Sequence, residues 1–309
     1  MSKVDISVVI PVKNGQRYLD SVLKAIFSQK TNAKFEVIIV DSGSQDKTMD
    51  IAKNYPVNIY QIEERNFNHG LTRNYGISKA QGEYLILMTA DAIPYNDSWM
   101  EKLIGNLARD ERVAGAYSRQ MPHRDSFPLT QIRVNRFFTS SIERRESQIT
   151  DIDIYNKLFP QNKHQFCNFD NVSSCIRKSI WKEFPFSKTD FAEDLEWSKS
   201  VLEAGYKIVY EPDSIVYHSH DFSPSDWYAK NMLNCHKLYS LFGVVNNIDR
   251  IHALLNFIFY TIRDSYFLCR EQHSIKVIAS NIHLIPAYSF STVLAQYRST
   301  KGYRQSPNP

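Results

Sequence analysis

Aliphatic and β-branched residues come in short uninterrupted runs through the first 90 residues, with helical patterns between the runs. The run at residues 6–12, followed by Lys13-Asn14-Gly15, is typical of a buried strand that ends in a turn. Such runs predict strands at residues 6–12, 35–40, 57–62 and 84–88, and helices at residues 19–27, 46–53 and 70–80. Apolar strands separated by helices indicate an α/β fold with a mostly parallel central sheet covered by helices.

Polar residues follow three of the expected strands. They are Pro11–Asn14 after the first strand, Asp41–Ser44 after the second and Thr89–Asp91 after the fourth. The carboxyl ends of parallel strands share one edge of a sheet, and ligands bind at that edge in such folds, so we expect these segments to form one site. Each segment alone is also typical of an ordinary turn, because Asp, Ser, Asn and Gly are common turn residues.

The pattern is less regular from residue 121 to residue 171, where arginines, side-chain amides and aromatic residues are frequent. We expect long loops and helical pieces over the site in this part of the chain. Further strands are expected at residues 172–176, 206–210 and 215–217. A helix is expected at residues 192–204, because two acids open it and Gly205 follows it.

Beyond Pro224 the pattern changes to helices with many aromatic residues. We therefore expect an α/β domain at residues 1–222 and a C-terminal helical region at residues 223–309. One helix of this region carries an apolar stripe made of Ile251, Leu254, Leu255, Ile258 and Ile262. This apolar segment is too short to cross a bilayer, and we favour a core helix or a homodimer contact over a peripheral contact with the inner face of the membrane.

The basic excess of the chain lies in the C-terminal region. The formal net charge is +4, and residues 222–309 contain nine Lys and Arg against four acids. This excess suits an anionic membrane surface or an anionic substrate, or it is a set of scattered solvated charges; it is too small to favour a nucleic-acid binder. The four cysteines show no paired spacing and no signal peptide is visible, so we expect a cytoplasmic protein with reduced thiols.

Four ordered segments resemble glycosyltransferases of family 2, which have the GT-A fold. They are "ISVVIPVKNGQRYLDSVLKAIFSQ" at residues 6–29, "FEVIIVDSGSQDKT" at 35–48, "RNYGISKAQGEYLILMTADAIP" at 73–94 and "AEDLEWSKSVLEAGYKIVYEPDSIVYHSH" at 192–220. Within that family, "FNHGLTRNYGI" at 67–77 and "TADAIP" are most similar to bacterial rhamnosyltransferases. The resemblance implies an enzyme that transfers a sugar, in the narrower match L-rhamnose from dTDP-rhamnose, with a UDP-hexose as the alternative donor.

The resemblance also assigns donor-binding positions. The first strand exit would contact the base and ribose, and Asp41 would accept the imide N–H of uracil or thymine. Arg73 follows a helix start and its fork suits phosphate oxygens, although it could also be a solvated helix arginine. His69 would touch the sugar or diphosphate or cap the following helix. The expected donor-binding residues are Pro11, Val12, Asn14, Asp41, Ser42, Gly43, His69, Arg73 and Ala90.

Asp91 matches the last acid of the family's DxD metal motif, and Thr89 stands where the first acid would be. A hard cation that holds a diphosphate can bind through one or two protein ligands, because phosphate oxygens and water fill the other positions. The resemblance places His218 as a second ligand, with His220 as its alternative. We therefore expect Mg²⁺ or Mn²⁺ at Asp91 and His218.

Asp194 in "AEDLEWS" matches the family's catalytic base. An acceptor hydroxyl must lose its proton as it attacks the anomeric carbon, and a carboxylate at a helix N-terminus is favoured in its ionised form. Glu193 and Trp197 would line the sugar or acceptor pocket, whereas a plainer interpretation has the two acids only complement the helix dipole. The resemblance implies inversion by single displacement, onto a bacterial surface polysaccharide or a lipid-linked glycan.

Two other functions fit the sequence less well. A nucleotidyltransferase would need a glycine-rich phosphate loop near the first strand, where only Gly15 is present. A non-catalytic nucleotide-sugar-binding protein would have no need to keep Asp41, Asp91 and Asp194 together.

Overall fold

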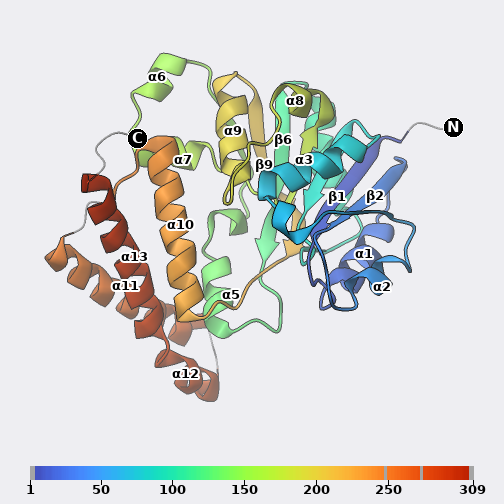
Figure 1. The fold of residues 1–309 in the computed structure, drawn as a ribbon. Helices are drawn as coiled ribbons and strands as arrows, with labels where there is room; N and C mark the ends of the chain where they lie inside the picture. Colours follow the sequence, from blue (N-terminus) through green and yellow to red (C-terminus); the bar gives the residue numbers. More distant parts are fainter. Residues whose placement is uncertain (1–3, 247–248, 272–273, 306–309) are drawn as a thin grey trace. The chain divides into compact units, whose positions relative to one another are not determined.

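The computed structural model describes residues 4–246, 249–271 and 274–305. The chain forms two compact units (Figure 1). The first unit consists of Met1–Met121, Phe137–Lys157 and Phe166–His218. The second consists of Pro122–Arg136, Leu158–Gln165 and Ser219–Pro309. The irregular middle of the sequence is thus divided between the units, whereas we had placed all of it in the α/β domain.

The first unit is built on one mixed sheet. Its strands are β1 (Ile6–Val12), β2 (Phe35–Asp41), β3 (Asn58–Gln61), β4 (Tyr84–Met88), β5 (Ile93–Pro94), β6 (Val113–Met121), β7 (Arg145–Gln148), β8 (Ser173–Arg177) and β9 (Lys207–Tyr217). Its helices are α1 (Leu19–Phe27), α2 (Thr48–Ala52), α3 (His69–Lys79), α4 (Trp99–Arg109), α6 (Ile152–Asn156), α8 (Lys178–Glu183) and α9 (Glu193–Glu203). The strands and helices predicted in the first 90 residues are all present.

The strand order is β3-β2-β1-β4-β8-β6-β9-β5, and β7 pairs with β9. Strands β1 to β4 are parallel, so their carboxyl ends share one edge, as predicted: Val12 lies opposite Asp41, and Val9 lies opposite Leu87. Strand β8 runs antiparallel to β4. The sheet is therefore less uniformly parallel than expected, and the amino end of β8 lies at the edge where β4 ends.

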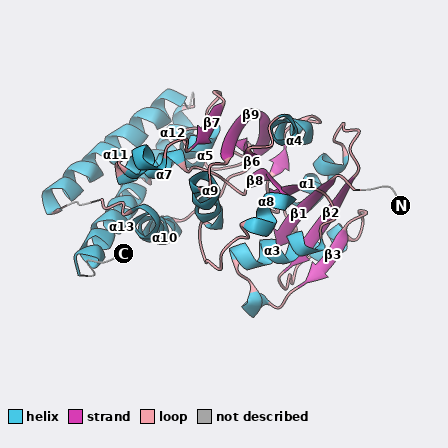
Figure 2. Cartoon of the chain, turned by 90° about the horizontal axis from the view of Figure 1, so that it is seen from above, coloured by secondary structure: helices cyan, strands magenta, loops and turns pink. Residues whose placement is uncertain are grey.

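Helices cover both faces of the sheet (Figure 2). Alternate residues of a strand point to opposite faces, and Val8 and Ile10 of β1 belong to the buried cluster that also contains α1 and α4. Val9 points the other way, toward α3. Gly76 permits this close packing, because a Cβ atom built there would lie 2.5 Å from Val9 Cγ1. Helix α3 thereby begins beside the carboxyl ends of β1 and β2.

The second unit is helical. Its helices are α5 (Pro128–Val134), α7 (Pro160–Phe166, whose last residue belongs to the first unit), α10 (Pro224–Phe242), α11 (Arg250–Glu271), α12 (Ile275–Ile282) and α13 (Ile285–Gln305). Leu129, Ile132, Leu268, Ile285 and Tyr288 form its buried core.

The apolar stripe of α11 is exposed, so the interpretation of this stripe as part of the core is wrong. The exposed residues are Ile251, Leu254, Leu255, Ile258, Phe259, Ile262 and Tyr266, and their spacing follows one face of the helix. Within the described residues, no single helix has both the length and the hydropathy of a membrane-spanning segment. The pair Ile275–Ile282 and Ile285–Gly302, bent by 42°, meets those criteria jointly.

Candidate active site

A cavity of about 350 Å³ opens at the carboxyl ends of β1, β2 and β4. Its lining comes from the three strand exits and from the start of α3, so these exits lie together around one cavity, which is the candidate site. The lining residues are Pro11, Val12, Lys13, Ser42, Glu64, Phe67, His69, Arg73, Met88 and Thr89. Five of the expected donor-binding residues, namely Pro11, Val12, Ser42, His69 and Arg73, are among them.

Three other expected residues organise the loops around this cavity. Asn14 has a positive φ of 50°, and its Oδ1 accepts a hydrogen bond from the Gln45 N–H at 2.8 Å. The Asn14 N–H donates to Ser44 Oγ at 2.8 Å, and the buried Asp41 carboxylate accepts from the Ser44 N–H at 3.1 Å. Gly43, which lies between Asp41 and Ser44 in the chain, has a φ of 88°, in a region that favours glycine. The first two strand exits are therefore tied together through their own polar groups.

Helix α3 places His69 at the cavity, but His69 does not cap the helix. The N-cap is Asn68, whose side chain accepts a hydrogen bond from the Leu71 N–H. Lys13 and Glu64, which sequence reasoning missed, form an ion pair of 2.5 Å within the cavity lining. Lys13 could have been found, since it lies between two motif residues, whereas nothing in the sequence around Glu64 marks it.

Arg73 is buried, with 5% of its surface exposed, so the interpretation of it as a solvated helix arginine is wrong. Its Nε donates to Glu193 Oε1 at 2.8 Å. Its Nη1 donates to the carbonyl of Met88 at 3.4 Å, and its Nη2 to the carbonyl of Asn171 at 3.3 Å. One guanidinium thus joins α3, the end of β4, the start of β8 and the start of α9. Its use as a phosphate ligand remains a prediction.

The two acids that open α9 have opposite electrostatic environments. Burial alone would raise the pKa of Glu193, but the Arg73 guanidinium, together with His69 and a backbone hydrogen bond, holds the pKa below its usual range. Burial, the Glu193 charge and the Asp170 charge raise the pKa of Asp194 well above its usual range. The expectation that the helix N-terminus would keep Asp194 readily ionised is therefore wrong, because burial and like charges outweigh the helix dipole.

Backbone groups hold the Asp194 carboxylate in place. Its Oδ2 accepts from the Asn171 N–H at 3.1 Å, and its Oδ1 accepts from the Leu195 N–H at 2.8 Å. Ala192, just before the two acids, has a φ of 54°, which is uncommon for a residue other than glycine. Such local strain is found at functional sites, where the surrounding structure maintains it.

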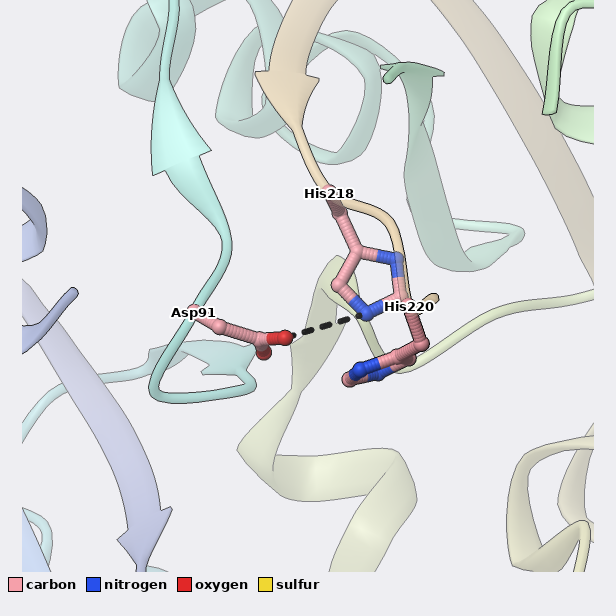
Figure 3. A group of neighbouring side chains, drawn as sticks. All are labelled: Asp91, His218 and His220. Atoms are coloured by element: carbon pink, nitrogen blue, oxygen red, sulfur yellow. Dashed lines mark ion pairs between the residues drawn. The ribbon is translucent and has the colours of Figure 1, made fainter. Parts of the chain in front are cut away.

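Asp91 and His218 lie together, as predicted. His218 Nε2 is 3.6 Å from Asp91 Oδ2, and the two side chains point toward one another (Figure 3). His218 Nδ1 is 3.0 Å from Gln120 Oε1. An amide oxygen can only accept, so Nδ1 carries a proton, and in the neutral imidazole Nε2 then has its lone pair on the side of Asp91. His220, two residues farther along the chain, belongs to the second unit.

A divalent cation fits this pair of side chains. Carboxylate oxygen and neutral imidazole are both ligands of Mn²⁺-type cations, and two atoms 3.6 Å apart can both lie about 2.1 Å from one ion. Thr89, at the position of the missing acid, lines the cavity. Its buried Oγ1 has no hydrogen-bond partner among the described residues. A buried hydroxyl without a partner is typical of a place where a ligand or water binds.

Asp170 and Asn171 connect the Asp91–His218 pair with the two acids of α9, and sequence reasoning missed both. Gln120, which orients His218, donates from Nε2 to Asp170 Oδ2 at 2.9 Å. Asn171 binds both acids of α9: its N–H donates to Asp194, and its Nδ2 donates to Glu193 Oε1 at 3.3 Å. The signal that could have found them is two polar residues directly before β8, at the edge where β4 ends.

Two expected residues lie elsewhere. Trp197 is buried in the core, where its ring centroid is 5.1 Å from Phe169 and 5.9 Å from Phe186, and its Nε1 donates to the carbonyl of Phe184. Trp197 therefore packs α9 against the core of the first unit. It does not line the cavity, in contrast to the role expected for it in a sugar or acceptor pocket. Ala90 is half-buried and packs against the core under the strand exits.

Comparisons with known proteins give matches to one family of enzymes. The family model Glycosyl transferase family 2 matches residues 7–165. The chain is 30% identical over 231 residues to the O-antigen chain rhamnosyltransferase RfbN of Salmonella typhimurium, a match that covers 73% of this chain and 69% of that protein. It is 33% identical over 203 residues to the O-antigen chain rhamnosyltransferase WbaN of Salmonella anatum, covering 64% of this chain and 61% of that protein.

Two solved structures share the fold. The mannosyltransferase PcManGT from Pyrobaculum calidifontis, in complex with GDP-Man and Mn²⁺, matches with a TM-score of 0.54 and 16% identity, covering 100% of this chain and 77% of that chain. Residues 1–349 of S. aureus TarS match with a TM-score of 0.54 and 16% identity, covering 98% of this chain and 92% of that chain. At such low identity the likeness concerns the fold alone.

The Arg73–Glu193 pair is testable by unfolding. Removing one partner of a buried ion pair leaves an uncompensated charge, so Arg73→Met should lower the free energy of unfolding by about 3–5 kcal/mol. Arg65→Met is the matched control, because Arg65 forms an exposed pair with Glu63 and should cost at most about 1 kcal/mol. Urea titrations would measure both. Equal losses in the two variants would show that the Arg73 pair does not hold the site together.

Proposed function

Because the chain belongs to glycosyl transferase family 2 and has the GT-A fold with C-terminal helices, it is a glycosyltransferase, and we propose that it transfers L-rhamnose from dTDP-rhamnose to a hydroxyl group of a bacterial surface glycan. The observation that carries this proposal is the arrangement at one sheet edge: a cavity, the Asp91–His218 pair and the Asp194 carboxylate. The names of the two Salmonella relatives support rhamnose as the sugar and an O-antigen glycan, or its lipid-linked precursor, as the acceptor.

The nucleotide would bind across the ends of β1 and β2. Asp41 offers the carboxylate for the imide N–H of thymine, and Ser42 lies in the cavity wall next to it. The buried Val12 and the half-buried Pro11, at the end of β1, would enclose the base and ribose. His69 and Lys13, farther along the same cavity, would face the sugar and the diphosphate, where their N–H groups can donate to oxygen atoms.

Asp91 and His218 would hold Mg²⁺ or Mn²⁺, and the bound cation would neutralise the charge of the diphosphate leaving group. Asp194 would accept the proton of the acceptor hydroxyl as it attacks the anomeric carbon, with inversion of configuration. A raised pKa suits this role, since a carboxylate of ordinary pKa is a weak base at neutral pH. Arg73 and Glu193 keep Asp194 beside the donor cavity.

Replacement of Asp194 tests the base. Asp194→Asn should lower turnover by about 10²–10⁴-fold, the usual contribution of a general base, and leave donor binding intact. In the unmodified enzyme, kcat/KM should fall as the pH drops through the raised pKa of Asp194, above the usual range for aspartate. Asp170→Asn removes a like charge, so it should lower the pKa of Asp194. The fall of kcat/KM on the acid side of the pH profile should then occur at lower pH. Full activity of Asp194→Asn would rule out the base assignment.

Replacement of the metal pair tests the cation. Asp91→Ala and His218→Ala should each weaken Mn²⁺-dependent binding of a dTDP-sugar, measured by calorimetry with and without the cation. A loss of about tenfold or more corresponds to the 1.4 kcal/mol expected for one ligand contact. Asp97→Ala is a control, since Asp97 is an exposed acid paired with Lys30. Unchanged affinity in the first two variants would make Asp91 and His218 structural residues.

A UDP-hexose is the second candidate donor, because a structure of S. aureus TarS with UDP-GlcNAc shares the fold, with a TM-score of 0.51. Uracil and thymine present the same imide N–H, so Asp41 does not distinguish dTDP from UDP. Thermal shifts with a panel of nucleotide sugars separate the candidates, because a specific ligand stabilises the native state. A non-catalytic binder would bind a donor without hydrolysing or transferring its sugar.

The exposed stripe of α11 suits a peripheral contact with an anionic membrane. Projected on the helix, His252, Arg263 and Arg270 follow one border of the stripe and Arg250 lies beside the other, while Asp249, Asp264 and Glu271 fall on the opposite side of the helix. An apolar face bordered by basic residues is typical of helices that lie in the membrane interface. In a homodimer of this stripe, the basic borders of the two copies would lie near each other, which is unfavourable.

Vesicle binding tests this contact. Ile258→Glu should weaken sedimentation with vesicles of phosphatidylethanolamine and phosphatidylglycerol by about tenfold, since it removes one apolar side chain and adds a like charge to that of the lipid. Ile142→Glu is the matched control, because Ile142 is an exposed isoleucine of the first unit that lies outside the stripe. Binding unaffected by Ile258→Glu would contradict the proposal. A solution dimer that Ile258→Glu dissociates would instead assign the stripe to a second copy.

A further inference from the structure

The second unit contains a polar cavity of about 170 Å³ that the proposed reaction does not use. Helices α5, α10, α11 and α13 all contribute to its wall. The lining residues are Arg133, Trp227, Tyr260, Arg263, Asp264, Ser289 and Thr292. Ligand cavities for drug-sized molecules are usually about 300 Å³ or larger, so this cavity suits one small chemical group.

Arg133 brings a desolvated positive charge to the cavity. Its guanidinium lies between two aromatic rings, 4.7 Å from the Trp227 centroid and 4.1 Å from the Tyr288 centroid. Burial lowers the pKa of Arg133. Asp264, the carboxylate in the cavity wall, attracts Arg133 but is also paired with Arg263 at 2.7 Å. One carboxylate beside two arginines leaves a net positive charge in the wall, which favours an anionic ligand.

Ser289 supplies a hydroxyl group that points to a ligand. The residue is 2% exposed, lines the cavity, and its Oγ has no hydrogen-bond partner among the described residues. The neighbouring Thr292 is satisfied, because its Oγ1 accepts from Trp227 Nε1 at 2.9 Å and donates to the Tyr288 carbonyl at 3.1 Å. Leaving a buried hydroxyl unpaired is unfavourable, so Ser289 would gain from a bound group that accepts its hydrogen bond.

We propose that this cavity binds a single phosphate group through Arg133, Arg263 and Ser289. The three donors come from three different helices, α5, α11 and α13, and so approach the cavity from different directions. That arrangement suits a tetrahedral oxyanion better than a planar carboxylate, which a single arginine fork already satisfies. Arg263 keeps donors for the ligand, because its contacts with Asp264 use Nε and Nη2, and Nη1 has no hydrogen bond to any residue in the described ranges.

The phosphate has three possible sources with the same chemistry: free phosphate, a lipid headgroup, or the diphosphate of a lipid-linked acceptor. Arg263 also borders the exposed stripe of α11, so a phosphate at the membrane surface could reach both features. Use of the site for the acceptor rests on the proposed function. The phosphate site itself does not depend on it.

Calorimetry with inorganic phosphate, at constant ionic strength set with chloride, tests the site in the full chain. Arg133→Gln should weaken phosphate binding by about tenfold or more, since it removes the positive charge and the charge-assisted hydrogen bonds of the guanidinium. Arg298→Gln is the matched control: it removes the same charge from an exposed arginine of the same unit, outside this lining, and should leave binding unchanged.

Ser289→Ala separates a binding site from a structural role of Arg133. It removes the unpaired hydroxyl, so the variant should be at least as thermally stable as the unmodified protein and still bind phosphate several-fold more weakly. A purely structural cluster would not give this combination. Absence of phosphate binding to the unmodified protein, or equal binding to the unmodified, Arg133→Gln and Ser289→Ala proteins, would overturn the proposal.

Two further probes identify the source of the phosphate. Farnesyl diphosphate represents a lipid-linked diphosphate, and phosphatidylethanolamine vesicles containing phosphatidic acid represent a headgroup. The affinity of each probe is compared with that of inorganic phosphate. A probe that binds more tightly than inorganic phosphate, and loses this extra affinity in Ser289→Ala, identifies the source. Equal affinity for all three ligands assigns the site to free phosphate. Dependence on Ser289 supports the site in each case. Donor binding and its Mn²⁺ dependence are measured separately, so failure here leaves the proposed reaction untouched.

Discussion

The buried ion pair between Arg73 and Glu193 is the interaction on which the site depends. It joins residues 120 positions apart and places the start of α9 beside the donor cavity. The same guanidinium binds carbonyl groups at the end of β4 and the start of β8, so it fixes the distance between the strand exits and the acids of α9. A buried charge pair of this kind is often no more stabilising than a pair of apolar residues in the same place, but removing only one of its two partners is strongly destabilising. Its main effect here is to fix the positions of the strand exits and of α9.

The ion pair also separates the chemistry of two adjacent acids. Glu193 pairs with Arg73 and therefore stays ionised. Its negative charge then lies next to the Asp194 carboxyl group. Asp170 adds a second like charge from the other side. Asp194 is therefore less stable as a carboxylate in the folded protein than in water, which weakens folding above the usual aspartate pKa and strengthens Asp194 as a base. A pair of acids with pKa values pushed apart is a common way to give neighbouring carboxyl groups different tasks.

Patterns local in sequence predicted most of the first unit. Runs of apolar residues marked β1 to β4, and parallel pairing then brought Pro11, Asp41 and Thr89 to one edge. The Asp91–His218 pair was predicted from motif position and lies as expected. What escaped prediction depends on partners distant in sequence. The role of Arg73 is decided by Glu193 and Asn171, and the burial of Trp197 is decided by Phe169 and Phe186.

The second unit also shows what a pattern local in sequence cannot predict. The periodic apolar stripe of α11 was visible in the sequence, but periodicity cannot tell whether a face meets the core or solvent. In the structure, the core of the second unit includes Leu268 of α11 and leaves the stripe exposed. The polar cavity is likewise invisible in the sequence, because Arg133 and Ser289 meet only through the packing of α5 and α13 beside α11. Within the described residues, α11 therefore presents an exposed apolar face to solvent and also places Arg263 in the cavity wall near Arg133. Both features depend on which residues of other helices pack against α11, and the sequence of α11 alone does not contain that information.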